Sequence, residues 1–209
     1  MTDSNYETEQ EDFWSGDFGD HYIERNNSIE MLASQLNFFS RALKSAIGVE
    51  SCIEFGANIG VNLKAIKMLY PNMDLNAIEI NESAQMELSK VVNHSNIYKG
   101  SILDYPVSKV FDLVIIKGVL IHINPQMLKK TYEKLVESTC KYLLVAEYYN
   151  PSPVSLSYRG HKDRLFKRDF VGEIIDNFPS MKLIDYGFSY RRDPHFPQDD
   201  ITWFLLEKT

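Results

Sequence analysis

The chain has 209 residues, of which 44% are hydrophobic and 24% charged, and its formal net charge is −7. This length suits one domain with a sizeable core. We find neither a bilayer-spanning apolar run nor a signal-peptide pattern, so we expect a cytoplasmic protein without a membrane partner. Seven acidic residues and no Lys or Arg lie within positions 1–20. This acidic start argues against a nucleic-acid partner, which would need a basic surface.

The first third of the chain predicts a tail, an aromatic segment and a helix. Residues 1–10 are polar and acidic, which predicts disorder. Large aromatic residues then interrupt the acidic run: Phe13, Trp14, Phe18 and Tyr22. They form either a cap on the core or a lid over a bound ligand, and we favour the lid. Apolar residues at three- and four-residue spacing predict a helix over 27–47. We therefore divide the single domain into an N-terminal segment, 1–48, and a core, 49–209.

Strand and helix patterns alternate through the core. We predict strands near 50–55, 75–80, 96–99, 111–117 and 141–147, with helices near 60–70, 82–92 and 125–139. A further helix over 167–178 and two strands near 181–190 and 201–207 close the chain. This alternation predicts a parallel sheet with helices on both faces. Ligands of such sheets bind beyond the carboxyl ends of the strands.

Cysteine and histidine usage predicts no disulfide and no metal site. Cys52 and Cys140 both lie at predicted strand starts, which favours two buried, reduced thiols. The five histidines show no metal-ligand spacing with one another or with cysteine.

The most informative motif follows the first predicted strand. An apolar run ends at Glu54, and Gly56, Asn58 and Gly60 follow before a helix pattern begins. Glycines allow a sharp turn and close approach of a ligand, and the helix start directs N–H groups into the loop. The carboxylate of Glu54 would repel a pyrophosphate, whereas it would accept hydrogen bonds from an amino group or ribose hydroxyls.

The pattern Glu54-x-Gly56-x-Asn58-x-Gly60 resembles motif I of the class I S-adenosylmethionine (SAM) methyltransferases, E/D-x-G-x-G-x-G, with Asn58 replacing the middle glycine. Residues 75–81, 98–104 and 111–122 resemble the next three motifs, in order. The resemblance implies a Rossmann-like α/β fold whose seven-stranded, mostly parallel sheet contains an antiparallel C-terminal strand. It also implies SAM as cofactor and S-adenosylhomocysteine (SAH) as product.

The resemblance further implies roles for individual residues. The methionine part of SAM would lie within the loop that contains Glu54, Gly56, Asn58 and Gly60, with its amino group at the carbonyls of Lys117 and Gly118. Glu79 would bind the ribose hydroxyls. The adenine would contact Ile80, Ile102, Leu103 and Asp104, the last of which could instead be a turn residue before Pro106. The lid would add Trp14, Tyr22 and Arg25 to the cofactor site.

Two segments after the fifth strand are candidates for the acceptor side. Residues 158–169 contain five Lys or Arg residues, which favours an anionic acceptor over a solvated helix face with its own acidic partners. The candidate acceptor-binding residues are Asn150, Arg159, Lys162 and Arg168. A hydroxyl acceptor would need a base, for which the candidates are His122, Tyr149 and His161. His122 could equally be a structural histidine, and an amine acceptor would need no base.

The whole chain resembles the methylases associated with pseudaminic acid biosynthesis, through residues 13–19, 54–60, 117–125 and 147–151. This resemblance implies methyl transfer to an oxygen or nitrogen of a small, anionic, carbohydrate-like acceptor such as a sugar nucleotide or nonulosonic acid. Two other hypotheses stay open: an NAD(P)-dependent reductase on a Rossmann fold, and a non-catalytic SAM-binding module. The protein would be a monomer or homodimer.

Overall fold

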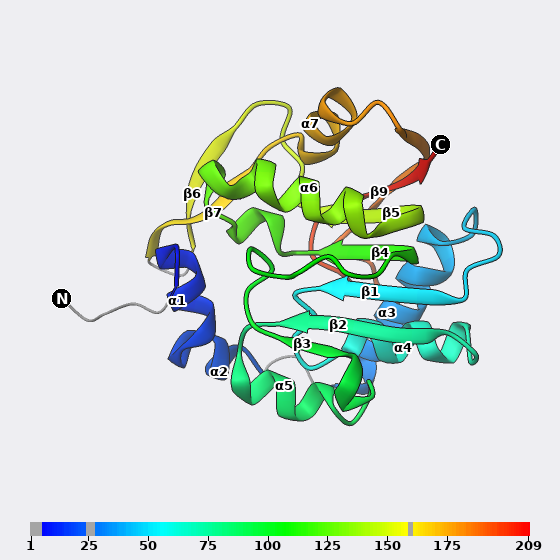
Figure 1. Cartoon of the computed structure of the whole chain (residues 1–209). Helices are drawn as coiled ribbons and strands as arrows, with labels where there is room; N and C mark the ends of the chain where they lie inside the picture. The colour runs from blue at the N-terminus through cyan, green and yellow to red at the C-terminus, as the bar shows by residue number, and fades with distance from the viewer. Residues whose placement is uncertain (1–5, 24–27, 159–160) are drawn as a thin grey trace.

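The computed structural model describes residues 6–23, 28–158 and 161–209, and only the backbone of residues 161–163. Its centre is a seven-stranded sheet in the order β3-β2-β1-β4-β5-β9-β8 (Figure 1). The strands are β1 (Ser51–Phe55), β2 (Asp74–Glu79), β3 (Ile97–Lys99), β4 (Phe111–Lys117), β5 (Thr139–Glu147), β8 (Met181–Ser189) and β9 (Ile201–Lys208). β1 to β5 pair in parallel, and β9 is antiparallel to both of its neighbours, β5 and β8. The predicted fold class is confirmed.

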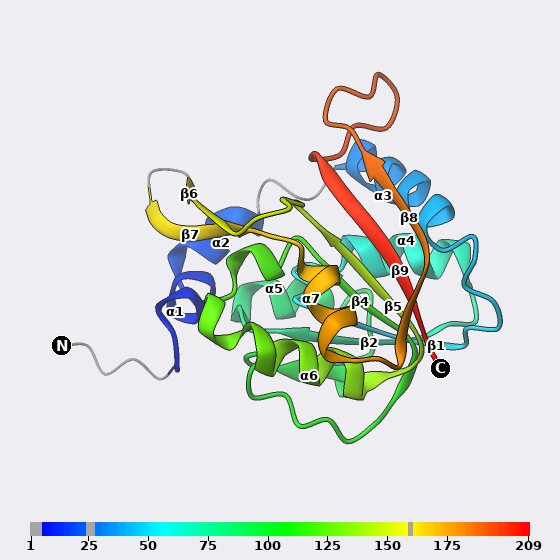
Figure 2. The ribbon, with the colours of Figure 1, turned by 90° about the horizontal axis from the view of Figure 1, so that it is seen from above.

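Helices cover both faces of the sheet (Figure 2). α3 (Ile29–Ala42) and α4 (Val61–Leu69) share one apolar cluster, to which α5 (Glu82–Leu88) adds Leu88. α6 (Leu128–Ser138) and α7 (Phe170–Asn177) belong to the cluster on the opposite face. Alternate residues of β1, Cys52 and Ile53, enter opposite clusters, as the two-residue period of a strand requires. A strand buried on both faces must be apolar throughout, which explains the continuous hydrophobic runs.

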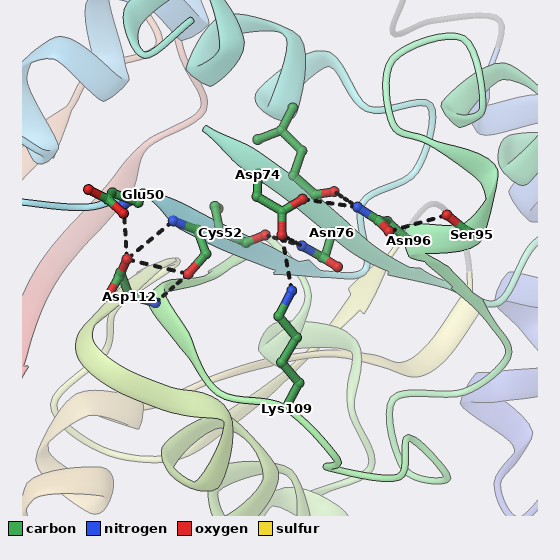
Figure 3. Close-up of polar contacts among 10 residues, drawn as sticks. Glu50, Cys52, Asp74, Asn76, Ser95, Asn96, Lys109 and Asp112 are labelled. Atoms are coloured by element: carbon green, nitrogen blue, oxygen red, sulfur yellow. Dashed lines mark hydrogen bonds and ion pairs between the residues drawn. The ribbon is translucent and has the colours of Figure 1, made fainter. Parts of the chain in front are cut away.

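Polar side chains hold together the amino ends of the central strands (Figure 3). The carboxylate of Asp112 accepts hydrogen bonds from the amides of Glu50 and Ser51, at 2.9 and 3.3 Å. Asp74 pairs with Lys109 at 3.0 Å and accepts from the side-chain amide of Asn96 at 3.1 Å. These contacts tie neighbouring strands at the edge of the sheet that faces away from the predicted site.

The opposite edge carries elements that the sequence patterns only partly predicted. α1 (Glu9–Ser15) and α2 (Asp17–Ile23) lie beyond the arrowheads of β1 and β2 (Figure 1). α1 starts within the segment that we predicted to be disordered. Thr8 and Glu11 form its capping box, which satisfies the free amides at the helix start. An antiparallel hairpin, β6 (Val154–Tyr158) and β7 (His161–Lys167), occupies the region that we predicted as loops.

The described residues also form three short 3₁₀ helices: η1 (His94–Asn96), η2 (Leu120–His122) and η3 (Pro125–Met127). The prediction of two buried cysteines was half wrong, because Cys52 is buried but Cys140, near the start of β5, is exposed. In the part of the chain that the structure describes, no helix is both long and apolar enough to cross a membrane.

Candidate functional site

A cavity of about 250 Å³ lies at the carboxyl ends of β1, β2 and β4, at the point where the strand order reverses. Its floor comes from the loops that follow these three strands and β3. α1 and α2 contribute Glu11, Trp14, Gly19 and Tyr22, so the aromatic segment that we predicted as a lid lies against the cavity.

The loop after β1 turns through three residues with positive φ. Gly56 has a φ of 75°, and an added Cβ would lie 2.7 Å from Cγ2 of Val119. Asn58 has a φ of 49°, and its Oδ1 accepts a hydrogen bond from the amide of Ile59 at 2.7 Å. Asparagine tolerates this left-handed backbone better than other non-glycine residues. The loop therefore keeps a glycine-like turn although the middle glycine of the motif is absent.

Gly60 is the N-cap of α4, with a φ of 81°. An added Cβ would lie 2.7 Å from Cδ1 of Leu88 in α5. Gly60 is not among the cavity-lining residues, whereas its neighbours Ile59 and Val61 are. Close packing of α5 on the loop therefore explains the need for glycine here.

Glu79, at the end of β2, is only 7% exposed and lines the cavity. One carboxylate oxygen accepts from the amide of Asn58 at 2.6 Å, and the other accepts from the amide of Asn81 at 2.8 Å. Burial raises its pKa, and these amide hydrogen bonds oppose the rise. Each oxygen retains a second lone pair, so the carboxylate can still accept hydroxyl donors.

Glu54, at the end of β1, is 1% exposed and lies behind the cavity wall. Its Oε1 accepts from the side-chain amide of Asn62 at 2.6 Å. Its Oε2 is buried and has no hydrogen-bond partner among the described residues. Burial raises the pKa of Glu54 to about 8, although the Asn62 hydrogen bond and the charge of Lys117 lower it. At this pKa the carboxyl group is largely protonated at neutral pH, and a nearby cationic ligand would favour its ionised, accepting form.

Lys117, at the end of β4, is half-buried and lines the same cavity. Its Nζ lies 5.2 Å from the ring centre of Phe38. Burial lowers the pKa of Lys117, and the nearby charges of Glu54, Asp199 and Glu147 oppose that effect.

Glu147, at the end of β5, supports the loop that follows β4. Its Oε1 accepts from the amides of Val119 and Leu120, at 2.9 and 2.8 Å. Burial raises the pKa of Glu147 to about 7, against these hydrogen bonds. Our sequence analysis did not single out this residue, although it ends an apolar strand just as Glu54 and Glu79 do.

His122, in η2, is buried against the lid and lines the cavity. Its Nδ1 lies 2.6 Å from the carbonyl oxygen of Arg164. Because a carbonyl only accepts hydrogen bonds, Nδ1 carries the proton and Nε2 carries the lone pair. Burial lowers the pKa of His122 to about 4, so the ring is neutral at pH 7. The rings of Trp14 and Tyr158 flank it, with centroids at 4.7 and 4.9 Å.

Polar contacts attach the lid to the core. The side-chain amide of Asn81 donates to the carbonyl of Trp14 at 3.4 Å and to the carboxylate of Asp20 at 3.0 Å. Ion pairs join Glu7 to Lys130 and Glu9 to Arg164, at 2.8 and 3.1 Å. Part of the acidic N-terminal charge therefore docks the segment onto the core.

The structure brings together eleven of the predicted site residues around the cavity. They are Trp14, Tyr22, Gly56, Asn58, Glu79, Ile80, Ile102, Leu103, Lys117, Gly118 and His122. The cavity lining also includes residues that we did not predict: Glu11, Gln35, Asn62, Tyr148, Tyr158 and Asp199.

Besides Glu54 and Gly60, four predicted residues lie outside the lining. Asp104 is exposed, and Tyr149 is 43% exposed with its ring near Phe204. The side-chain amide of Asn150 donates to the carbonyl of Ser152, and Arg168 pairs with Glu173 at 3.0 Å.

The remaining predicted residues are not described in full. Arg25 and Arg159 lie outside the described residues, as do the side chains of His161 and Lys162. Within the described chain, no group of three or more His, Cys, Asp or Glu side chains is arranged to hold a metal ion.

Solved structures with this fold are SAM-dependent methyltransferases. The mitomycin 7-O-methyltransferase MmcR matches with a TM-score of 0.70 and 10% identity, over 97% of this chain and 61% of its own. Magnesium protoporphyrin IX methyltransferase (ChlM) from Synechocystis PCC 6803, with bound SAM, matches with a TM-score of 0.65 and 13% identity, over 99% of this chain and all of its own. The N-methyltransferase NodS from Bradyrhizobium japonicum WM9, with bound SAH, has a TM-score of 0.62 and 14% identity, over 90% and 97% of the two chains.

These likenesses show that the chain has the fold of class I methyltransferases, as the motifs predicted. At such identities they establish the fold alone. No protein-family model matches the sequence, and the comparison with curated proteins also gives no match. The resemblance to methylases associated with pseudaminic acid biosynthesis therefore stays a prediction.

Proposed function

We propose that the protein is a methyltransferase that uses SAM to methylate an oxygen or nitrogen of a small acceptor. The observation that carries the proposal is the position of Glu79. Its buried carboxylate meets the positive-φ loop of Gly56 and Asn58 at one cavity, at the switch point of the sheet. The antiparallel β9 between β5 and β8 argues against the alternative NAD(P)-dependent reductase.

The residues present fit SAM. Glu79 would accept from the two ribose hydroxyls, while Ile80, Ile102 and Leu103 offer apolar contacts to the adenine. The unpartnered Oε2 of Glu54 suits the positive field of the amino group, and the carbonyls of Lys117 and Gly118 would accept its N–H groups. When bound, SAM supplies a methyl group on a positively charged sulfur.

The chain would mainly align the acceptor and keep water away from the reacting atoms. Trp14 and Tyr22 of the lid would exclude water. For a hydroxyl acceptor, Nε2 of His122 would receive the proton, because Nδ1 is held by the Arg164 carbonyl. Tyr149 and His161 stay candidates from the sequence alone. An amine acceptor would need only a site that binds its neutral form.

We further propose a carbohydrate-like, anionic acceptor such as a nonulosonic acid, as the resemblance to the methylases associated with pseudaminic acid biosynthesis implies. The aromatic rings of Tyr148 and Tyr158 line the cavity and offer flat faces to a sugar ring. The anionic character depends on the sequence, through Arg159 and Lys162. Arg164 and Arg168 lend it less support, because each pairs with a glutamate of this chain.

Calorimetric titration of the protein with SAM and SAH tests the cofactor. We expect micromolar binding of both ligands and a large loss of affinity in Glu79→Ala. Glu82→Ala is a matched control, because Glu82 is an exposed acid of the adjoining α5. Unchanged affinity in Glu79→Ala would contradict the proposed site. Binding of NADH with no binding of SAM or SAH would favour the reductase.

Turnover tests the enzyme against the non-catalytic SAM-binding module. We would incubate the protein with SAM and a panel of sugar nucleotides, nonulosonic acids and their amino-sugar precursors, and measure SAH formation. Acceptor-dependent SAH formation supports the methyltransferase. SAM binding without turnover on any acceptor would favour the module.

A further inference from the structure

The capping box of α1 leaves one carboxylate oxygen at the cavity. Oε2 of Glu11 accepts from the backbone amide and the hydroxyl of Thr8, at 2.8 and 2.9 Å. Oε1 of Glu11 is buried and has no hydrogen-bond partner among the described residues. Glu11 is 7% exposed and lines the cavity. A buried acceptor without a donor is costly, so this oxygen suits a ligand that brings an N–H or O–H group.

The position of Glu11 relates it to the loop that follows β3. Lys130 interacts electrostatically with both Glu11 and Asp104, so these two acids lie near the same cation. Ser101, Ile102 and Leu103 of this loop line the cavity together with Glu11, whereas Asp104 is exposed and does not line it. The resemblance to the methyltransferases implies that the adenine lies at this loop and that Asp104 accepts from its amino group.

Other acceptors on this side of the cavity already have donors. The hydroxyl of Thr8 accepts from the amide of Glu11, and Oε1 of Gln10 accepts from Asn124 at 3.3 Å. The hydroxyl of Ser101 accepts from the amide of Leu103 at 3.0 Å. Among the described cavity-lining residues, Oε1 of Glu11 is one of two buried side-chain oxygens without a hydrogen-bond partner, the other being Oε1 of Gln35.

We infer that Glu11 accepts a hydrogen bond from the 6-amino group of the adenine and thereby selects adenine over 6-oxopurine bases. The inference rests on the proposed function, because it requires an adenosine cofactor in this cavity. It also makes α1 part of the cofactor site, so that base recognition and closure of the lid are the same event.

Glu11→Gln provides a sharp test, because glutamine also serves in a capping box. Its amide oxygen would replace Oε2 toward Thr8, and its NH₂ group would stand in the place of Oε1. A donor would then face the 6-amino donor of SAH, whereas it would complement the 6-carbonyl oxygen of S-inosylhomocysteine. We expect SAH to bind about tenfold or more weaker and S-inosylhomocysteine to bind more tightly than in the wild type.

Calorimetric titration of the full chain with SAH and S-inosylhomocysteine gives the readout. Asp104→Asn makes the same carboxylate-to-amide change near the same cation, and we expect it to leave both affinities unchanged. Thr8→Val perturbs the capping box but keeps Glu11, so it should affect both ligands equally.

Equal weakening of both ligands in Glu11→Gln would show a merely structural role and overturn the inference. If Asp104→Asn, and not Glu11→Gln, changed the preference between the two ligands, Asp104 would be the residue that accepts from the adenine amino group. A wild type that binds no SAH would reject the proposed function, and the inference with it.

Discussion

Burial of Glu54 should make the protein less stable as pH rises. The folded-state pKa of Glu54 is about 8, against an ordinary value of 4.5. Between these two values the folded state holds a proton that the unfolded state has released, so the free energy of unfolding falls with increasing pH. Integrating this difference from pH 5.5 to pH 8 gives a loss of about 3 kcal/mol from this one group. Such a loss is a large fraction of the stability of a typical domain.

Glu54→Gln isolates this contribution. Glutamine keeps the oxygen that accepts from Asn62, and it does not titrate. Any loss of stability caused by its amide group is therefore the same at both pH values. Chemical denaturation at pH 5.5 and pH 8 should show that the variant loses about 3 kcal/mol less than the wild type over this interval. Glu147 also makes the free energy of unfolding fall as pH rises, whereas His122 makes it rise with pH below pH 6.5. Only the difference between the wild type and Glu54→Gln therefore isolates Glu54.

Glu50→Gln is the matched control, because Glu50 is exposed at the amino end of the sheet. It should show the wild-type dependence on pH. Equal slopes in the wild type and Glu54→Gln would refute the argument, since they would mean that Glu54 ionises in the folded state as it does in the unfolded state.

Three further predictions concern the loop, the histidine and the lid. Gly56→Ala should lower the free energy of unfolding by about 2–5 kcal/mol, because alanine is strained at this positive φ and its Cβ would contact Val119. In thermal melts, adding Val119→Ala should recover only the part of this loss that comes from the contact. His122 has a pKa lowered from 6.5 to about 4, so its contribution to stability is present above pH 6.5 and falls as pH drops. Denaturation should show a loss of about 2 kcal/mol between pH 7.5 and pH 5 that His122→Phe lacks, and an NMR titration of the His122 ring above pH 5 would contradict this. Asn81→Ala should free α1 and α2, and faster limited proteolysis within residues 6–23 would show it. An unchanged rate around Trp14 would mean that other contacts, such as the ion pairs and the packing of Trp14 on His122, hold the segment without Asn81.

The sequence predicted the sheet, and many of the residues that line the cavity, for a local reason. The strands are continuous apolar runs that end in an acid, and the loop after β1 needs residues that tolerate positive φ. Both signals lie within a few adjacent residues, so Glu54, Gly56, Asn58 and Glu79 could be identified as candidates. The two strand patterns after the final helix were also predicted, whereas the antiparallel strand was expected from the resemblance to the methyltransferases.

The lid and the acceptor side depended on contacts between residues far apart in the chain. Only the fold pairs Glu9 with Arg164 and Arg168 with Glu173, so the sequence could not show that these basic side chains are partly neutralised. Apolar and polar residues alternate in 154–158, but 161–167 is mostly charged and shows no such alternation, and the hairpin was missed.

The sequence by itself determined most of the strands and helices of the core and the turn that shapes the cavity, because local backbone preference and apolar periodicity are properties of neighbouring residues. The tertiary structure alone decided which acids face the cavity. Asp104 and Glu11 are both acids beside polar turns in the sequence, yet only Glu11 lies at the cavity wall with a buried oxygen. Burial and hydrogen-bond partners arise when distant segments pack together, and they set the charge state and the chemistry of each side chain.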